Sequence, residues 1–152
     1  MEHAPLYYKP LEQEKTKQLS SKSGKFDAFM KVTTNIVKDI SWCVENLQKS
    51  VRAISQGKPN IIINSDASLR GHGATVTYGK KGECSGVWST DEQKLHINIP
   101  ELKACQYALL ALCKDYSDTH VRINVDNMTC LSYIIKYGGK TKVLNNIARD
   151  IW

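Results

Sequence analysis

The sequence predicts an α/β protein, or α+β in some classifications: a mixed sheet whose first three strands are antiparallel, with helices packed on it. Two observations support this fold class. Short β-branched segments joined by glycine-containing turns begin at Asn60, and this pattern is typical of antiparallel strands. A fourth strand-like segment follows a helical one, so it is expected to enter the sheet by a crossover connection. A helical extension, residues 1–58, precedes this part, and residues 59–152 form the predicted domain.

The N-terminal part contains helix formers and few strand signals. Residues 1–10 include Pro5 and Pro10 and are predicted to be an extended lead-in. Residues 11–19 are rich in Glu, Gln, Lys and Leu, which predicts a short polar helix. Residues 20–25 have the Ser, Lys and Gly composition of a flexible loop.

A second helix is predicted after residue 30. Thr33 or Thr34 is suited to cap it, and Gly57-Lys58-Pro59 ends it and marks the proposed boundary. Its apolar residues recur at steps of three and four, which predicts that the helix packs on a neighbour. They are Ile36, Val37, Ile40, Cys43, Val44, Leu47 and Val51.

The strands of the predicted sheet are segments 61–63, 74–78, 84–88 and 121–125. The first is a continuous run of three isoleucines, which indicates a central strand covered on both faces. Turns are expected at 71–73 and, as a hairpin connection, at 79–82. Helices are predicted from Pro100 to about residue 114, over 128–137, and from Thr141 onward.

Three carboxylates lie at the edges of these predicted elements. Asp66 and Asp126 close strand-like segments, and Glu101 opens a helix. If the two strands are neighbours and the helix packs across them, the three side chains converge at one place. Carboxylate oxygens are preferred ligands of Mg²⁺, so the pattern favours a site for metal-assisted phosphoryl chemistry. Each residue alone is equally typical of a turn or a helix start.

Charge and cysteine content restrict the function classes. The formal net charge is +6 and the pI is about 9.0, which favours a polyanionic partner. The five cysteines form no C-x-x-C pair, so free thiols in a reducing compartment are expected. Neither a signal peptide nor a stretch suited to cross a membrane is recognisable. We therefore expect an intracellular protein, cytoplasmic or nuclear and not secreted, without a membrane partner.

Five short motifs follow one another along the chain: Asp66-Ala67-Ser68, Trp88-Ser89, the run from His96 to Ala104, Val125-Asp126-Asn127-Met128-Thr129 and Tyr137-Gly138-Gly139. In this order and spacing they resemble the ribonuclease H domain of retroelement reverse transcriptases, most closely that of the DIRS-group retrotransposons. The resemblance covers about 59–152. Residues 1–58 resemble more loosely the segment that joins the polymerase thumb to the ribonuclease H domain.

The resemblance implies a metal-dependent endonuclease that hydrolyses the RNA strand of RNA–DNA hybrids. Asp66, Glu101 and Asp126 would be its catalytic metal ligands, holding two Mg²⁺ or Mn²⁺ ions. Specificity for RNA would come from contacts to 2′-hydroxyl groups. The partners implied are a nucleic acid, the hybrid above all, and the reverse transcriptase polymerase domain of the parent polyprotein. No Tyr-x-Asp-Asp motif of a polymerase is present.

Three polar residues are candidates for substrate binding. Ser68 and Asn127 are placed to donate to RNA or to the carboxylates, although turn and helix-cap roles suit them equally. Asn98 is placed to contact the hybrid backbone or a 2′-hydroxyl, with a helix-entry role as the alternative. Trp88 is interpreted as a core residue rather than a stacking platform.

One departure from the family pattern leaves the activity open. The family uses a fourth carboxylate, an Asp after a fifth strand, and no such segment occurs here. Asp150 lies in an apolar-periodic run and is interpreted as a solvated helix position. The sequence thus resembles a fragment without its C-terminal end. The alternatives are a relic that binds nucleic acid without cutting it, and the core of a transposase or integrase.

Overall fold

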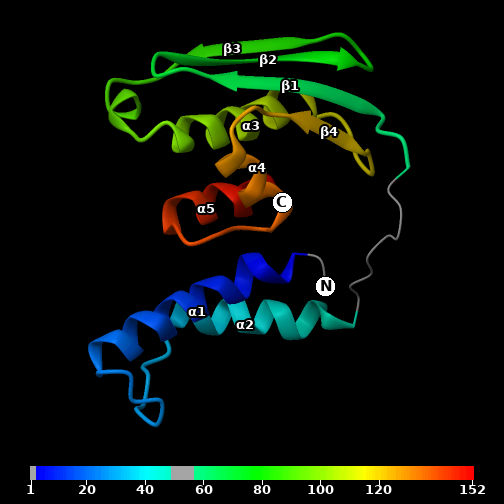
Figure 1. Cartoon of the computed structure of the whole chain (residues 1–152). Coiled ribbons are helices and arrows are strands. Elements are labelled where there is room, and N and C mark those ends of the chain that lie inside the picture. Colours follow the sequence, from blue (N-terminus) through cyan, green and yellow to red (C-terminus); the bar gives the residue numbers. More distant parts are fainter. Residues whose placement is uncertain (1–2, 49–56) are drawn as a thin grey trace.

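The computed structural model describes residues 3–48 and 57–152 as a mixed α/β protein (Figure 1). Its strands are β1 (Ile61–Ala67), β2 (Gly71–Tyr78), β3 (Glu83–Val87) and β4 (Val121–Asn124). Its helices are α1 (Ala4–Ser21), α2 (Thr34–Leu47), α3 (Asn98–Leu112), α4 (Met128–Ile135) and α5 (Lys142–Ile151), with a 3₁₀ turn, η1, at Glu92–Lys94. None of these helices is long and apolar enough to cross a membrane.

The four strands form one mixed sheet in the order β3-β2-β1-β4. β1 pairs antiparallel with β2, and β2 pairs antiparallel with β3. β4 lies parallel to β1, with Ile63 opposite Ile123 and Asn64 opposite Asn124. The prediction of three antiparallel strands and a fourth that enters by crossover is confirmed.

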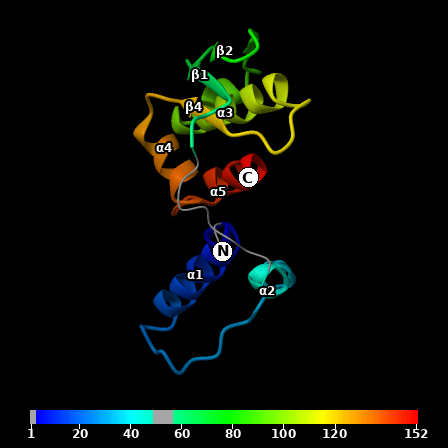
Figure 2. The same cartoon turned by 90° about the vertical axis from the view of Figure 1, so that its right-hand side faces the viewer.

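The helices of the described chain are stacked in layers on one face of the sheet (Figures 1 and 2). α3 packs directly on β1, β2 and β3, α5 packs on α3, and α1 and α2 form the outermost layer. Burial in β1 alternates accordingly: Ile61 and Ile63 are buried, whereas Asn64 and Asp66 are exposed. The prediction that this strand is covered on both faces was wrong, because a run of three apolar residues does not distinguish a two-sided strand from a one-sided one.

Two clusters of buried side chains form the core. One lies between α3 and the sheet and contains Ile61, Ile63, Ala74 and Ala108. The other joins four helices and contains Leu6, Leu102, Cys130, Tyr133, Leu144, Ile147 and Ala148. Helix α1 therefore shares a core with α3, α4 and α5.

The prediction of an extended lead-in over residues 1–10 was wrong from Ala4 onward, where α1 begins; residues 1 and 2 lie outside the described part of the chain. Pro5 lies in the first turn, where its missing N–H costs nothing. Pro10 lies inside the helix and cannot donate to the carbonyl of Leu6 four residues earlier. Arg149 of α5 donates to that carbonyl instead, with Nη2 2.6 Å from the Leu6 oxygen. A side chain from another helix thus replaces the missing backbone donor, which sequence patterns cannot reveal.

Helix α1 also holds the connection between α4 and α5. The Lys9 ammonium donates to the carbonyls of Lys136, Tyr137 and Gly138 at the end of α4. A cation at this position complements the negative end of the helix dipole. Burial and the neighbouring Lys136 lower the pKa of Lys9. Gly138 has a positive φ of 97°, which favours glycine.

The turn between β1 and β2 is formed by residues 68–70 rather than by 71–73. Ser68 Oγ accepts hydrogen bonds from the N–H groups of Arg70 and Gly71, and β2 begins at Gly71. A Cβ at Gly71 would lie 2.4 Å from the carbonyl oxygen of Gly86 on β3. This glycine therefore permits close strand pairing and does not mark the turn.

Helix α2 begins as predicted, with the Thr33 side chain accepting a hydrogen bond from the N–H of Ile36. Only part of its apolar surface meets a neighbour: Ile36 is buried, and Trp42 stacks on Tyr7 of α1 with ring centroids 3.6 Å apart. Of the other predicted core positions, Cys43 is half-buried, and Val37, Ile40, Val44 and Leu47 are exposed. Val51 lies outside the described residues. The prediction of packing is thus confirmed for one face of α2 only.

All five cysteines are free, as predicted. Cys105 and Cys130 are buried, and burial raises the pKa of Cys105 to about 11 and that of Cys130 to about 12. These thiols are neutral at physiological pH and act as small apolar core residues.

Candidate metal centre

The three predicted carboxylates lie at one end of the sheet, where the C-terminal ends of β1 and β4 meet the start of α3. Asp66 is the penultimate residue of β1, and Asp126 follows the last residue of β4 by two positions. Because β1 and β4 are parallel neighbours, their C-terminal ends lie side by side. Glu101 lies in the first turn of α3, which packs against β1. One carboxylate oxygen from each residue lies within 4.8 Å of those of the other two.

The triad combines one buried and two exposed carboxylates. Glu101 is only 7% exposed, whereas Asp66 and Asp126 are open to solvent. Burial, then Asp126, then Asp66 raise the pKa of Glu101 to about 7, and a backbone hydrogen bond from Ala67 acts in the opposite direction. None of the ion pairs in the described residues includes a member of the triad. The arrangement therefore concentrates negative charge without a protein counter-ion.

This donor set fits a hard divalent cation. Carboxylate oxygens are the ligands that Mg²⁺ prefers, and the ion usually keeps several waters besides one or two carboxylates. The two exposed members leave room for such waters. Burial first, and then the charges of Asp126 and Asp66, raise the pKa of Glu101, and a bound cation would favour its ionised form. Asp66, Glu101 and Asp126 could therefore hold a metal ion.

The three candidate substrate-binding residues surround this edge, and each is hydrogen-bonded within the protein. Asn127 Oδ1 caps α4 by accepting from the N–H groups of Thr129 and Cys130. Asn127 Nδ2 donates to Asn98 Oδ1 at 3.1 Å, which links the starts of α3 and α4. Ser68 forms the β1–β2 turn described above. Structural roles are thus established for all three, and their contact with substrate stays a prediction.

A pair of asparagines next to the triad was missed by sequence reasoning. Asn124 Nδ2 donates to Asn64 Oδ1 at 2.8 Å. The two residues stand opposite each other on β4 and β1, each two positions before an aspartate of the triad. Side chains two apart share a face of the sheet. The repeated Asn-x-Asp spacing in the two strands was the available signal.

Two other interpretations agree with the structure. Trp88 is 3% exposed, and its indole N–H donates to the carbonyl of Ser68 at 2.9 Å, so it is a core residue. Asp150 is exposed, accepts a hydrogen bond from Gln106, and is not part of the carboxylate group among the described residues. It is a solvated helix position, as predicted.

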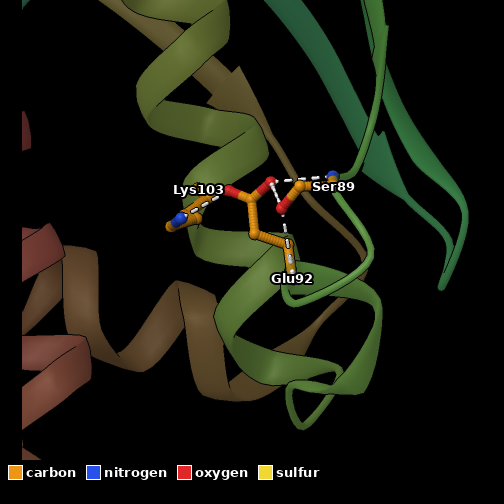
Figure 3. Close-up of polar contacts among 3 residues, drawn as sticks. All are labelled: Ser89, Glu92 and Lys103. Carbon is orange, nitrogen blue, oxygen red and sulfur yellow. Dashed lines mark hydrogen bonds and ion pairs between the residues drawn. The ribbon is translucent and has the colours of Figure 1, made fainter.

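The connection from β3 to α3 is fixed by a contact that sequence reasoning also missed (Figure 3). Glu92 Oε2 accepts from the N–H and the hydroxyl of Ser89, and Glu92 Oε1 accepts from Lys103 Nζ at 2.7 Å. The Ser-x-x-Glu spacing is the sequence signature of a capping box. Lys103 stands two residues after Glu101, so the contact fixes the connection close to the buried carboxylate.

This contact predicts a loss of stability in acid. Lys103 and Ser89 lower the pKa of Glu92 to about 2, from an ordinary value of 4.5. Its stabilising contribution is therefore complete above about pH 4.5 and is lost as the pH falls towards 2. We expect the difference in unfolding free energy between wild type and Glu92→Gln, measured by urea denaturation, to shrink between pH 5 and pH 2.5. Asp91→Asn is the control: it removes a 93% exposed partner of Lys94, so it should change the unfolding free energy little. An equal effect of Glu92→Gln and Asp91→Asn would contradict the prediction.

A shallow depression of about 1060 Å³ lies beside Asp66, over β1, β2 and β3. Its lining includes Gly71, Gly73 and Ser85, so few side chains stand between Asp66 and the opposite edge of the sheet. Glycine permits a close approach to the backbone. The exposed carboxylate is thus accessible from this side.

Comparison with protein-family models finds no match, and none of the curated proteins matches the chain either.

Proposed function

We propose that this chain is a ribonuclease H-type endonuclease, which hydrolyses the RNA strand of RNA–DNA hybrids as part of a retroelement reverse transcriptase. One observation carries the proposal: the three carboxylates of the sequence motifs lie within 4.8 Å of one another. The sheet is compatible with it, because the first three strands are antiparallel and Asp66 and Asp126 stand at the C-terminal ends of the parallel neighbours β1 and β4. The basic net charge of +6 is consistent with a nucleic-acid substrate.

Asp66, Glu101 and Asp126 would hold the two metal ions of this reaction. Bound Mg²⁺ or Mn²⁺ supplies a more acidic water and charge neutralisation at the phosphodiester. Glu101, buried in the first turn of α3, provides the fixed ligand of the group. Asp66 and Asp126 are exposed and face the solvent from which a phosphodiester approaches. Ser68, Asn98 and Asn127 would contact the RNA strand, where the 2′-hydroxyl separates RNA from DNA.

Cleavage of a labelled RNA–DNA hybrid in Mg²⁺ and in Mn²⁺ tests the proposal. We expect cutting of the RNA strand only, and no cutting of RNA or DNA duplexes of the same sequence. Asp66→Asn should lower the rate about 100-fold or more, because it removes a metal ligand. Asp115→Asn, an exposed aspartate outside the triad, should cut like wild type.

Two results would contradict the proposal. Equal rates for Asp66→Asn and Asp115→Asn would separate the activity from the triad. Tight binding of the hybrid without cleavage in either metal would identify a nucleic-acid-binding module, which the basic charge also favours.

A further inference from the structure

A second polar cavity, far from the triad in sequence, lies between α1, α2 and α5. Its volume is about 600 Å³. α1 and α5 each contribute one stripe of residues with helical spacing, ending in Lys17 on α1 and Arg149 on α5, and α2 contributes its first turns. The cavity is thus built from three helix faces and not from a mobile loop.

The charges that line this cavity favour an anion. Arg149 and Asp39 form a bidentate ion pair with N–O distances of 3.1 and 3.2 Å, so they neutralise each other. Lys17, Lys38 and Lys142 also line the cavity and take part in none of the ion pairs or side-chain hydrogen bonds of the described chain. Among the described residues that line the cavity, Glu14 is the one acidic residue outside an ion pair, and it accepts a hydrogen bond from Gln18.

Two helices also begin at this cavity. Thr33 and Asn35 at the start of α2 and Lys142 at the start of α5 are among its lining residues. The N-terminal end of a helix carries a partial positive charge and free N–H groups. α5 has no side-chain cap on these groups, because Thr141 forms no capping hydrogen bond. Three ammonium groups outside any ion pair of the described residues and the uncapped start of α5 therefore border one cavity of a size that admits a phosphate, together with the start of α2, where Thr33 already accepts from the N–H of Ile36.

We propose that this cavity binds a phosphate group of a polynucleotide backbone. α2, α3 and α5 all begin on the side of the molecule at which β1 and β4 end (Figure 1), so the two helix starts at the cavity lie on the same side of the molecule as the triad. Two helix-to-helix steps of about 8–10 Å, from α3 to α5 and from α5 to α1, span about 16–20 Å in all. That span corresponds to roughly five or six base pairs at 3.4 Å each. The polynucleotide as the source of the phosphate rests on the proposed function; the anion site itself does not.

The test compares two double variants with the same change in net charge. Lys38→Gln/Lys142→Gln alters the cavity, and Lys31→Gln/Lys114→Gln alters exposed lysines that do not line it. Affinity for a labelled hybrid is measured by fluorescence anisotropy at several salt concentrations, without divalent metal so that no cleavage occurs. In a second arm, inorganic phosphate is added and the melting temperature of each protein is followed. All four lysines are exposed, so both proteins should fold.

We expect the cavity variant to bind the hybrid about tenfold more weakly than the control variant, with a salt slope smaller by about one to two. Equal affinities of the two variants, with no effect of phosphate on stability, would overturn the proposal. The two variants could also bind the hybrid equally, while phosphate stabilises the control variant and not the cavity variant. That result would overturn the polynucleotide as the source of the phosphate and identify free phosphate as the ligand. Binding is measured without cleavage. An inactive triad would therefore refute the proposed function, but the difference in hybrid affinity between the cavity variant and the control variant would still test the anion site.

Discussion

Replacing Glu101 with glutamine should make the metal-free protein more stable at pH 8, although it removes a ligand of the proposed metal centre. The pKa of Glu101 is raised from 4.5 to about 7 in the folded protein. Its favourable contribution to folding is therefore complete below pH 4.5 and is lost as the pH rises through 7. At pH 8 the ionised carboxylate costs ~3 kcal/mol, since each pKa unit corresponds to about 1.4 kcal/mol. Glutamine avoids this cost and retains an oxygen that can accept the Ala67 hydrogen bond.

Urea denaturation at pH 5 and pH 8, with and without Mn²⁺, measures both effects. Wild type should lose stability from pH 5 to pH 8 without metal and regain it when Mn²⁺ binds. Glu101→Gln should show neither the pH dependence nor the response to metal. Glu83→Gln on β3, an exposed glutamate outside the triad, should behave like wild type. Stabilisation of Glu101→Gln by Mn²⁺ to the wild-type extent would refute the assignment of Glu101 as a ligand.

Replacing Arg149 with methionine should destabilise the protein by about 3 kcal/mol. This value is the lower end of the cost of breaking a buried ion pair, and we choose it because the Arg149 side chain is about one-third exposed. The guanidinium pairs with Asp39, donates to the Leu6 carbonyl and lies 4.8 Å from the ring centroid of Tyr7. Methionine leaves the Asp39 carboxylate, 12% exposed, without its partner. The loss should appear as a lower midpoint in urea denaturation at pH 7.

Two further variants separate the ion pair from general packing. Adding Asp39→Asn to Arg149→Met should restore part of the stability, because the unpaired charge is removed. Arg70→Met, at an exposed arginine of the β1–β2 turn, should change stability by less than about 0.5 kcal/mol. If the Asp39→Asn change were additive with Arg149→Met, the proposed pair would have no energetic role.

Local patterns located the four strands and predicted that the fourth enters the sheet by a crossover. The pairing of β4 with β1 came from the structure. The meeting of Asp66, Glu101 and Asp126 was predicted on the condition that these two strands are neighbours, and the structure meets that condition. The position of the β1–β2 turn was predicted wrongly, because glycine is typical both of turns and of places where two strands approach closely. Gly71 indicated a turn, but it is required for the close approach of β3.

Contacts between distant segments could not be predicted, because they leave no periodicity. The pairing of Arg149 with Asp39 and the binding of Lys9 to the end of α4 join residues more than 100 positions apart. A proline-containing segment such as 1–10 reads as non-helical by local rules. In the structure residues 4–10 are helical, and the Leu6 carbonyl, which Pro10 cannot serve, accepts from Arg149 of α5.

That hydrogen bond affects how the protein assembles. The donor to the Leu6 carbonyl is 143 residues away in sequence, so this carbonyl gains its partner only when α5 docks on α1. Short helices with an internal proline are unstable in isolation. Contacts between such distant residues form late, since the entropy of closing the intervening loop opposes them. The two ends of the chain therefore belong to one cooperative unit, and amide hydrogen exchange in α1 should report the opening of α5.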